Sequence, residues 1–152
     1  MAPLKIRRLL KCQKGAELIE FALVFPLLLL VVFGIMDFGF LFQRYEVLTN
    51  AAREGARVAV LPGYAQADVQ ARVTQYLSAS GMTAIPGFAF AAPQSVNVGG
   101  ACMTLTGVTV TYPHQYLFIG NIIGMFGGGG FGARTLTATA RMRYEGAAQA
   151  CP

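Results

Sequence analysis

The sequence has 152 residues, of which 55% are hydrophobic and 12% charged, with a formal net charge of +5. This length fits one domain better than two, and a soluble domain usually carries roughly 25% charged residues. Five basic residues and no acid lie within the first fifteen positions: Lys5, Arg7, Arg8, Lys11 and Lys14. The seven remaining basic residues are balanced by seven acids. The body is therefore formally neutral, which argues against nucleic-acid binding.

An apolar segment follows the basic residues and runs from Leu18 to Phe42. Residues 21–36 are all apolar or small, and the two acids of the segment are Glu20 and Asp37. A helix needs about 20 residues to cross a bilayer, so the segment predicts a membrane-spanning helix with its acids near the edges. By the positive-inside rule, the N-terminus is expected in the cytoplasm and the body in the periplasm.

A secretory signal peptide is the first alternative, because it also joins a basic region to an apolar one. Its apolar region is usually about 7–15 residues long, which is shorter than this segment. No small-x-small cleavage site lies in residues 36–45, which read MDFGFLFQRY. A retained single-pass anchor fits better.

The helical pattern continues beyond the apolar segment. An apolar stripe recurs there at three- and four-residue steps: Tyr45, Leu48, Ala52, Ala56 and Ala59. The dipeptide Pro62-Gly63 then ends the run. We predict one helix of about forty-five residues over 16–60, with irregularities at Pro26 and Gly34.

A smaller domain is expected after residue 63. A second helix is predicted at 65–80, with one face formed by Val69, Val73, Tyr76 and Ser80 and with Leu77 beside it. Residues 82–93 are expected to form a loop, because they are small, aromatic and proline-bearing.

Alternation predicts strands in the last third of the sequence. One is expected over 108–112, a longer one over 135–144 and a shorter one over 95–98. A short helix is expected near 117–125, with a flexible glycine link at 127–130. The predicted fold class is α+β: a long N-terminal transmembrane and amphipathic helix packed on a small antiparallel sheet with a second helix.

The most informative motif is GAELIEF at residues 15–21, between the basic leader and the apolar segment. Prepilin peptidases cut after a glycine in this position, which predicts cleavage between Gly15 and Ala16. Glu20 then becomes the fifth residue of the mature chain and Phe21 the sixth. The resulting organisation is a leader at 1–15, a transmembrane half-helix at 16–42 and a periplasmic domain at 43–152.

Glu20 has a physical role in this interpretation. A carboxylate inside an apolar segment costs about 2.5–3.5 kcal/mol at the bilayer centre and less near the edge. The free α-amine of a neighbouring subunit could pair with it, offset that cost and set the axial register of an assembly. The alternative for Glu20 is an acid that complements the dipole of the first helical turn, and for Gly15 an ordinary residue before a helix.

With these motifs, the chain resembles the TadE-like family of pilin-like proteins from tight-adherence (Flp-type) pilus systems. The resemblance rests on GAELIEFALVFPLLLLVVFGIMDFGFLF, on LTNAAREGARVAV and more weakly on TLTATARMRYE. It implies a minor pilin or pseudopilin that takes part in pilus assembly. The implied partners are a prepilin peptidase, other pilin subunits, the pilus assembly platform and the inner membrane.

Two other functions stay open. One is a membrane-anchored accessory subunit of another type II- or type IV-like secretion system, and the other is an exported protein with an unprocessed signal anchor. Enzyme activity is not expected, because no Ser/His/Asp set has motif spacing. The segment GGGGFGAR also lacks the lysine of a phosphate-binding loop.

Three features have two interpretations each. Asp37 is either an acid at the outer headgroup level or a subunit-pairing group. The segment AAREGAR at 51–57 is either a solvated face or a helix-docking surface. Cys102 and Cys151 form either one disulfide of an exported domain or two free thiols. Their spacing, with a lone His114, predicts no metal site and no cofactor.

Overall fold

The computed structural model describes residues 13–99, 101–125, 127 and 133–144. Its elements in chain order are α1 (Gln13–Ala59), α2 (Gln66–Ala79), β1 (Gly87–Val98), β2 (Ala101–Gln115), α3 (Ile119–Met125) and β3 (Ala133–Arg143). The predicted α+β class, with a long N-terminal helix, a second helix and an antiparallel sheet, is confirmed.

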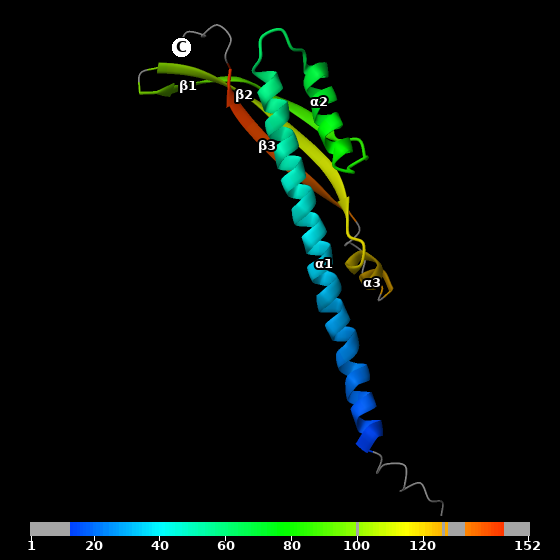
Figure 1. Cartoon of the computed structure of the whole chain (residues 1–152). Helices are drawn as coiled ribbons and strands as arrows, with labels where there is room; N and C mark the ends of the chain where they lie inside the picture. The colour runs from blue at the N-terminus through cyan, green and yellow to red at the C-terminus, as the bar shows by residue number, and fades with distance from the viewer. Residues whose placement is uncertain (1–12, 100, 126, 128–132, 145–152) are drawn as a thin grey trace, which may run out of the picture.

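Helix α1 is continuous over 47 residues, which corresponds to about 70 Å at about 1.5 Å per residue. It runs through Pro26 without a break (Figure 1). Proline removes one backbone hydrogen bond, and membrane helices tolerate this loss. The predicted boundaries after residues 15 and 42 both fall inside this one element.

The sheet has three antiparallel strands in the order β1-β2-β3. Strand β2 is longer than the predicted 108–112, and its central residues Val108, Val110 and Tyr112 are buried as the alternation requires. On β3 the inward positions Leu136, Ala138 and Ala140 are also buried. The predicted alternation is therefore confirmed at these positions, whereas Tyr144, the last residue of the predicted 135–144 strand, is 36% exposed.

The prediction of a loop over 82–93 is wrong from Gly87 onward, because β1 begins there and continues to Val98. Proline is disfavoured in central strands, and for this reason the segment that contains Pro93 was predicted to be a loop rather than a strand. The register of β1 against β2 shifts between Ala91 and Gln94, and Pro93 lies within this irregularity. Since β1 is an edge strand, the missing N–H is tolerated.

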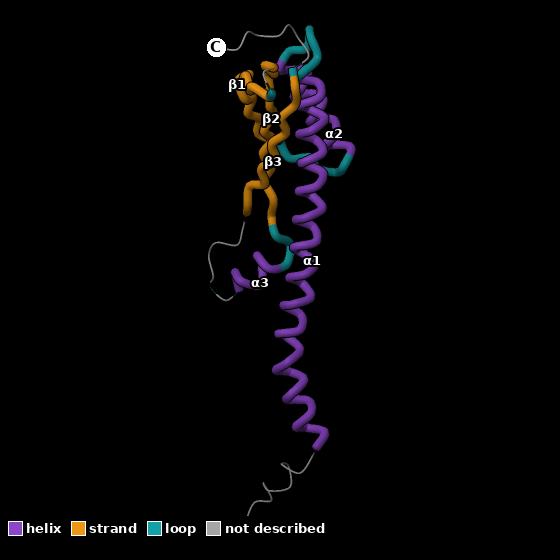
Figure 2. The backbone as a smooth tube through the Cα atoms, turned by 90° about the vertical axis from the view of Figure 1, so that its left-hand side faces the viewer, coloured by secondary structure: helices purple, strands orange, loops and turns teal. Residues whose placement is uncertain are grey.

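The hydrophobic core lies between the C-terminal half of α1, helix α2 and one face of the sheet. Both helices lie on the same side of the sheet (Figure 2), and α1 contacts β2, β3 and α2.

From α1 the core takes Leu48, Ala51, Ala52 and Ala56, whereas the predicted stripe member Tyr45 is 45% exposed. From α2 it takes Val69, Val73 and Leu77. Tyr76, predicted on this face, is 37% exposed.

Candidate functional site

The predicted processing motif lies at the start of α1, remote from the sheet (Figure 1). Gly15 and Ala16 are in the first turn of the helix, which begins three residues earlier than expected. Glu20 and Phe21 are exposed one turn further on, and the ring of Phe21 stacks on Phe25 with centroids 5.1 Å apart. Within the described part of the chain, no hydrogen bond or ion pair engages the Glu20 carboxylate.

Two glycines of α1 differ in what surrounds them. A Cβ added at Gly15 would have no atom within 4 Å. At Gly55, by contrast, an added Cβ would lie 2.6 Å from Cγ2 of Val73 on α2. Packing therefore requires a glycine at position 55, where α1 and α2 approach closely, whereas nothing in the described fold requires one at position 15.

The N-terminal half of α1 presents its apolar side chains outward. Five large side chains there are each at least 65% exposed: Leu18, Ile19, Leu23, Leu27 and Ile35. The helix is long and apolar enough to cross a membrane, and its most apolar eighteen-residue window contains no buried residue. A contiguous exposed apolar surface of this kind needs an apolar surrounding, so the helix fits a single-pass membrane anchor.

Asp37 is the exception in this exposed half, because it is only 1% exposed. Its Oδ1 accepts hydrogen bonds from the backbone N–H of Leu117 at 2.9 Å and of Phe118 at 3.3 Å. Its Oδ2 accepts from Phe118 at 3.0 Å and from Ile119 at 2.7 Å. The carboxylate thus caps the N-terminus of α3, a role that neither of its two sequence interpretations contained.

A second contact joins the same region of α1 to the end of β2. Arginine only donates hydrogen bonds, so Arg44 Nη1 donates to Nδ1 of His114 at 3.3 Å. His114 is therefore the neutral tautomer that carries its proton on Nε2, a buried atom with no hydrogen-bond partner among the described residues. Burial and the positive charge of Arg44 lower the pKa of His114, while Asp37 acts in the opposite direction.

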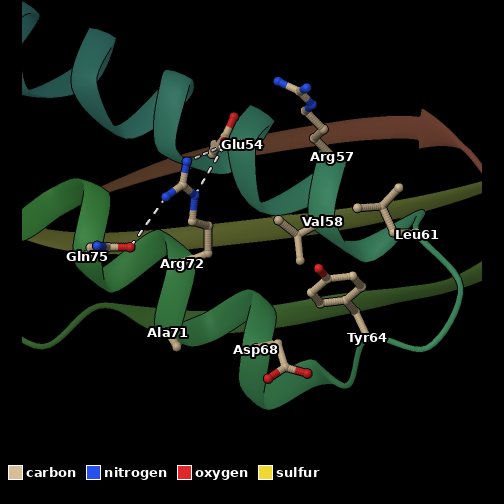
Figure 3. A pocket seen from close by; sticks show the side chains of 9 residues that line it. All are labelled: Glu54, Arg57, Val58, Leu61, Tyr64, Asp68, Ala71, Arg72 and Gln75. Atoms are coloured by element: carbon tan, nitrogen blue, oxygen red, sulfur yellow. Dashed lines mark hydrogen bonds and ion pairs between the residues drawn. The ribbon is translucent and has the colours of Figure 1, made fainter.

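The AAREGAR segment combines its two predicted roles. Ala51, Ala52 and Ala56 dock against the rest of the domain, while Arg53 and Arg57 face solvent. Arg72 of α2 pairs with Oε1 of Glu54 at 2.8 Å. Figure 3 shows this pair beside an open groove between α1 and α2, which Arg57 also lines.

Cys102 is disulfide-bonded in the structure. Both other cysteines, Cys12 and Cys151, lie outside the described residues, so the pairing with Cys151 stays a prediction. In the described ranges no group of three or more His, Cys, Asp or Glu side chains is placed to hold a metal ion.

The cap on α3 was missed in the sequence because its members lie eighty residues apart. The available signal was the presence of an acid, Asp37, within an apolar segment, which marks a group that needs a partner. The partner consists of backbone N–H groups, and these leave no trace in side-chain patterns.

Comparison with protein families finds that residues 15–57 match the family of TadE-like proteins. The matched region begins at Gly15 and follows α1 through its exposed apolar half into the part that packs on α2. No curated protein and no solved structure matches the chain. Over residues 15–57 the chain is thus similar to the TadE-like family, which agrees with the resemblance seen in the sequence.

Proposed function

We propose that this chain is a minor pilin or pseudopilin used in the assembly of tight-adherence (Flp-type) pili. A prepilin peptidase removes the leader after Gly15, and α1 anchors the mature subunit in the bacterial inner membrane with its sheet domain in the periplasm. The mature chain then associates with other pilin subunits and with the assembly platform.

The contrast between the two acids of the apolar segment carries this proposal. Asp37 has its hydrogen-bonding capacity used inside the molecule, whereas Glu20 is exposed and lacks an internal partner in the described part of the chain. An unpartnered carboxylate in an apolar surrounding is costly. A cation supplied by another molecule removes that cost, and cleavage after Gly15 creates one, the α-amine of Ala16, on every mature subunit.

The geometry of α1 is compatible with such pairing. Glu20 lies four residues after Ala16, about one helical turn and roughly 6 Å along the axis. A neighbour displaced axially by about one turn therefore brings its α-amine level with the carboxylate. Because the apolar side chains around Glu20 are exposed, a second α1 helix can lie against this face.

Replacement of Glu20 in a bacterium that carries the tight-adherence genes tests the proposal. Glu20→Ala should still be cleaved and inserted, because removal of a charge eases insertion, but pili should be lost. Glu20→Asp should give intermediate pilus numbers, since its carboxylate reaches about 1 Å less far and charge-assisted hydrogen bonds are short. Glu17→Ala, an exposed acid of the first turns, is the matched control and should leave pili unchanged.

Pilus counts by electron microscopy and the mass of the membrane-extracted chain are the two measurements. Wild-type pilus numbers in the Glu20→Ala strain would return Glu20 to a helix-dipole role. Equal losses in Glu17→Ala and Glu20→Ala would indicate a general effect of negative charge near the helix start.

A further inference from the structure

Helix α3 lies beside the exposed apolar half of α1, below the sheet (Figures 1 and 2). The ring of Phe118 stacks on Phe33 of α1, with centroids 4.9 Å apart and planes 11° from parallel. The ring of Tyr116 meets Phe38 edge to face at 6.5 Å. The segment that leads into α3 is thus attached to α1 over residues 33–38, inside the predicted membrane span.

The depth of this contact in the membrane follows from the rise per residue of α1. If Glu20 marks one edge of the hydrocarbon core, a core of about 30 Å ends about 20 residues later, near residue 40. Asp37 and Phe33 then lie about 5 and 11 Å inside the edge nearer the sheet. Helices that lie in a membrane interface are buried to a similar depth, about 5–10 Å.

The composition of the segment fits an apolar surrounding. Residues 115–133 contain no charged side chain, and they are flanked by His114 and Arg134. Leu117 is 51% exposed although it lies in this apolar run. Ile119 of α3 also lines an apolar groove together with Ile35 and Phe38, which are outward-facing side chains of α1 for which a membrane is already the expected surrounding.

Part of the backbone polarity at the start of α3 is satisfied inside the molecule. An N–H group without a partner in hydrocarbon costs several kcal/mol, and the first N–H groups of any helix lack intrahelical partners. Asp37 accepts from two of these groups, Phe118 and Ile119, and from Leu117, the residue before them. Asn121 returns a side-chain hydrogen bond to the carbonyl of Leu117 at 2.8 Å.

We propose that residues 116–125 are inserted in the leaflet nearer the sheet domain, as a second membrane contact beside α1. This inference rests on the proposed membrane span of α1. It adds that the sheet is held at the membrane surface by two attachments, so extraction of the subunit into a fibre must withdraw α3 together with α1.

The chain has no tryptophan, so single tryptophans serve as depth probes in the full-length protein. Leu117→Trp and Ile122→Trp report on the proposed contact, and two variants allow duplicate readings if one folds poorly. Leu28→Trp marks the span of α1, and Tyr76→Trp on α2 marks the domain outside the membrane. Each protein is reconstituted in vesicles whose lipids carry bromine near the headgroup or near the chain end, and iodide serves as the aqueous quencher.

We expect headgroup-proximal bromine to quench Leu117→Trp at least about twice as strongly as Tyr76→Trp, as a buried interfacial helix requires. Iodide should quench in the opposite order. Strong iodide quenching of both α3 probes would place α3 in water and overturn the proposal. Protection of both probes from bromine and from iodide would also overturn it, because a protein surface, such as α1 of a second copy, would then cover them.

The Leu28→Trp variant separates this inference from the proposed anchor. Bromolipid quenching of Leu28→Trp without quenching at α3 would refute the second contact alone. Absence of quenching at Leu28→Trp would refute the membrane span itself.

Discussion

Asp37 and Ile119 are 82 residues apart in the sequence, and the backbone N–H of Ile119 donates to Asp37 Oδ2 at 2.7 Å. This bond joins a helix predicted to span the membrane to a short helix that follows the central strand. The same carboxylate bonds Leu117 and Phe118, so one side chain fixes where α3 begins and against which part of α1 it lies.

Asp37→Ala should release α3 from α1. The backbone N–H groups of Leu117, Phe118 and Ile119 would lose a buried partner, and each buried group left without one costs about 1–3 kcal/mol. Hydrogen exchange measured on the full chain in detergent should show faster exchange at these three amides. Asp37→Asn should be intermediate, because one oxygen acceptor remains. Glu46→Gln, at an exposed acid of α1, should leave the rates unchanged, and unchanged rates in Asp37→Ala would contradict the cap.

Gly55→Ala should destabilise the domain although alanine favours helix by about 1 kcal/mol over glycine. The added methyl group would lie 2.6 Å from Val73, and overpacking of this kind costs about 1–3 kcal/mol. Gly39→Ala is the control, since an added Cβ there meets nothing within 4 Å. Denaturant unfolding of the two variants should separate them. In Gly55→Ala/Val73→Ala the loss should be smaller than the sum of the two single losses, and simple additivity would argue against a direct clash.

The free energy of unfolding should fall as the pH drops through the range in which histidine ordinarily titrates. The pKa of His114 is lowered in the folded state, so the unfolded chain binds the proton first. The stabilisation is therefore full above the unfolded pKa of about 6.5 and declines as the pH falls toward the lower folded value. His114 is the chain's single histidine, so His114→Gln should flatten the unfolding free energy between about pH 7.5 and pH 5.5. An equal slope in both proteins would exclude His114 as the cause.

Processing should depend on Gly15 for access rather than for folding. Gly15→Leu should keep its leader, because a bulky side chain blocks close approach to the backbone, yet it should fold normally, since an added Cβ there has no neighbour within 4 Å. Mass spectrometry of the membrane-extracted protein, with the peptidase present, reads the N-terminus directly. A mature chain that begins anywhere other than Ala16 would refute the predicted site.

The Cys102–Cys151 disulfide stays a prediction, and the end of β3 is the described part of the chain nearest in sequence to Cys151. Tyr144 donates its backbone N–H to the carbonyl of Thr104 at 2.7 Å, so the last described residue lies two positions along β2 from Cys102. A bond that closes a loop of about fifty residues contributes roughly 4 kcal/mol on chain-entropy grounds. Cys151→Ser should lower stability by a similar amount and leave the Cys102 thiol open to alkylation. Equal mobility of the wild type on reducing and non-reducing gels, with both thiols alkylatable, would exclude the bond.

The sequence by itself determined the long helix, its exposed apolar half and the two alternating strands. Each of these is a local pattern: apolar length sets a span, a 3.6-residue step sets a helix face, and strict alternation sets the two faces of a strand. The Gly15–Glu20 spacing is also local, and the TadE-like match covers this same stretch of α1.

Only the tertiary structure decided which distant segments of the chain contact one another. The strand from Gly87 was hidden by Pro93, because the edge position that tolerates a proline depends on strand order. The cap of α3 by Asp37 and the close approach at Gly55 were hidden for a related reason. Both depend on contacts between segments that are distant in the sequence. In the cap one partner is a backbone N–H, and at position 55 it is a glycine without a side chain. Neither contact therefore leaves a periodic pattern in the sequence.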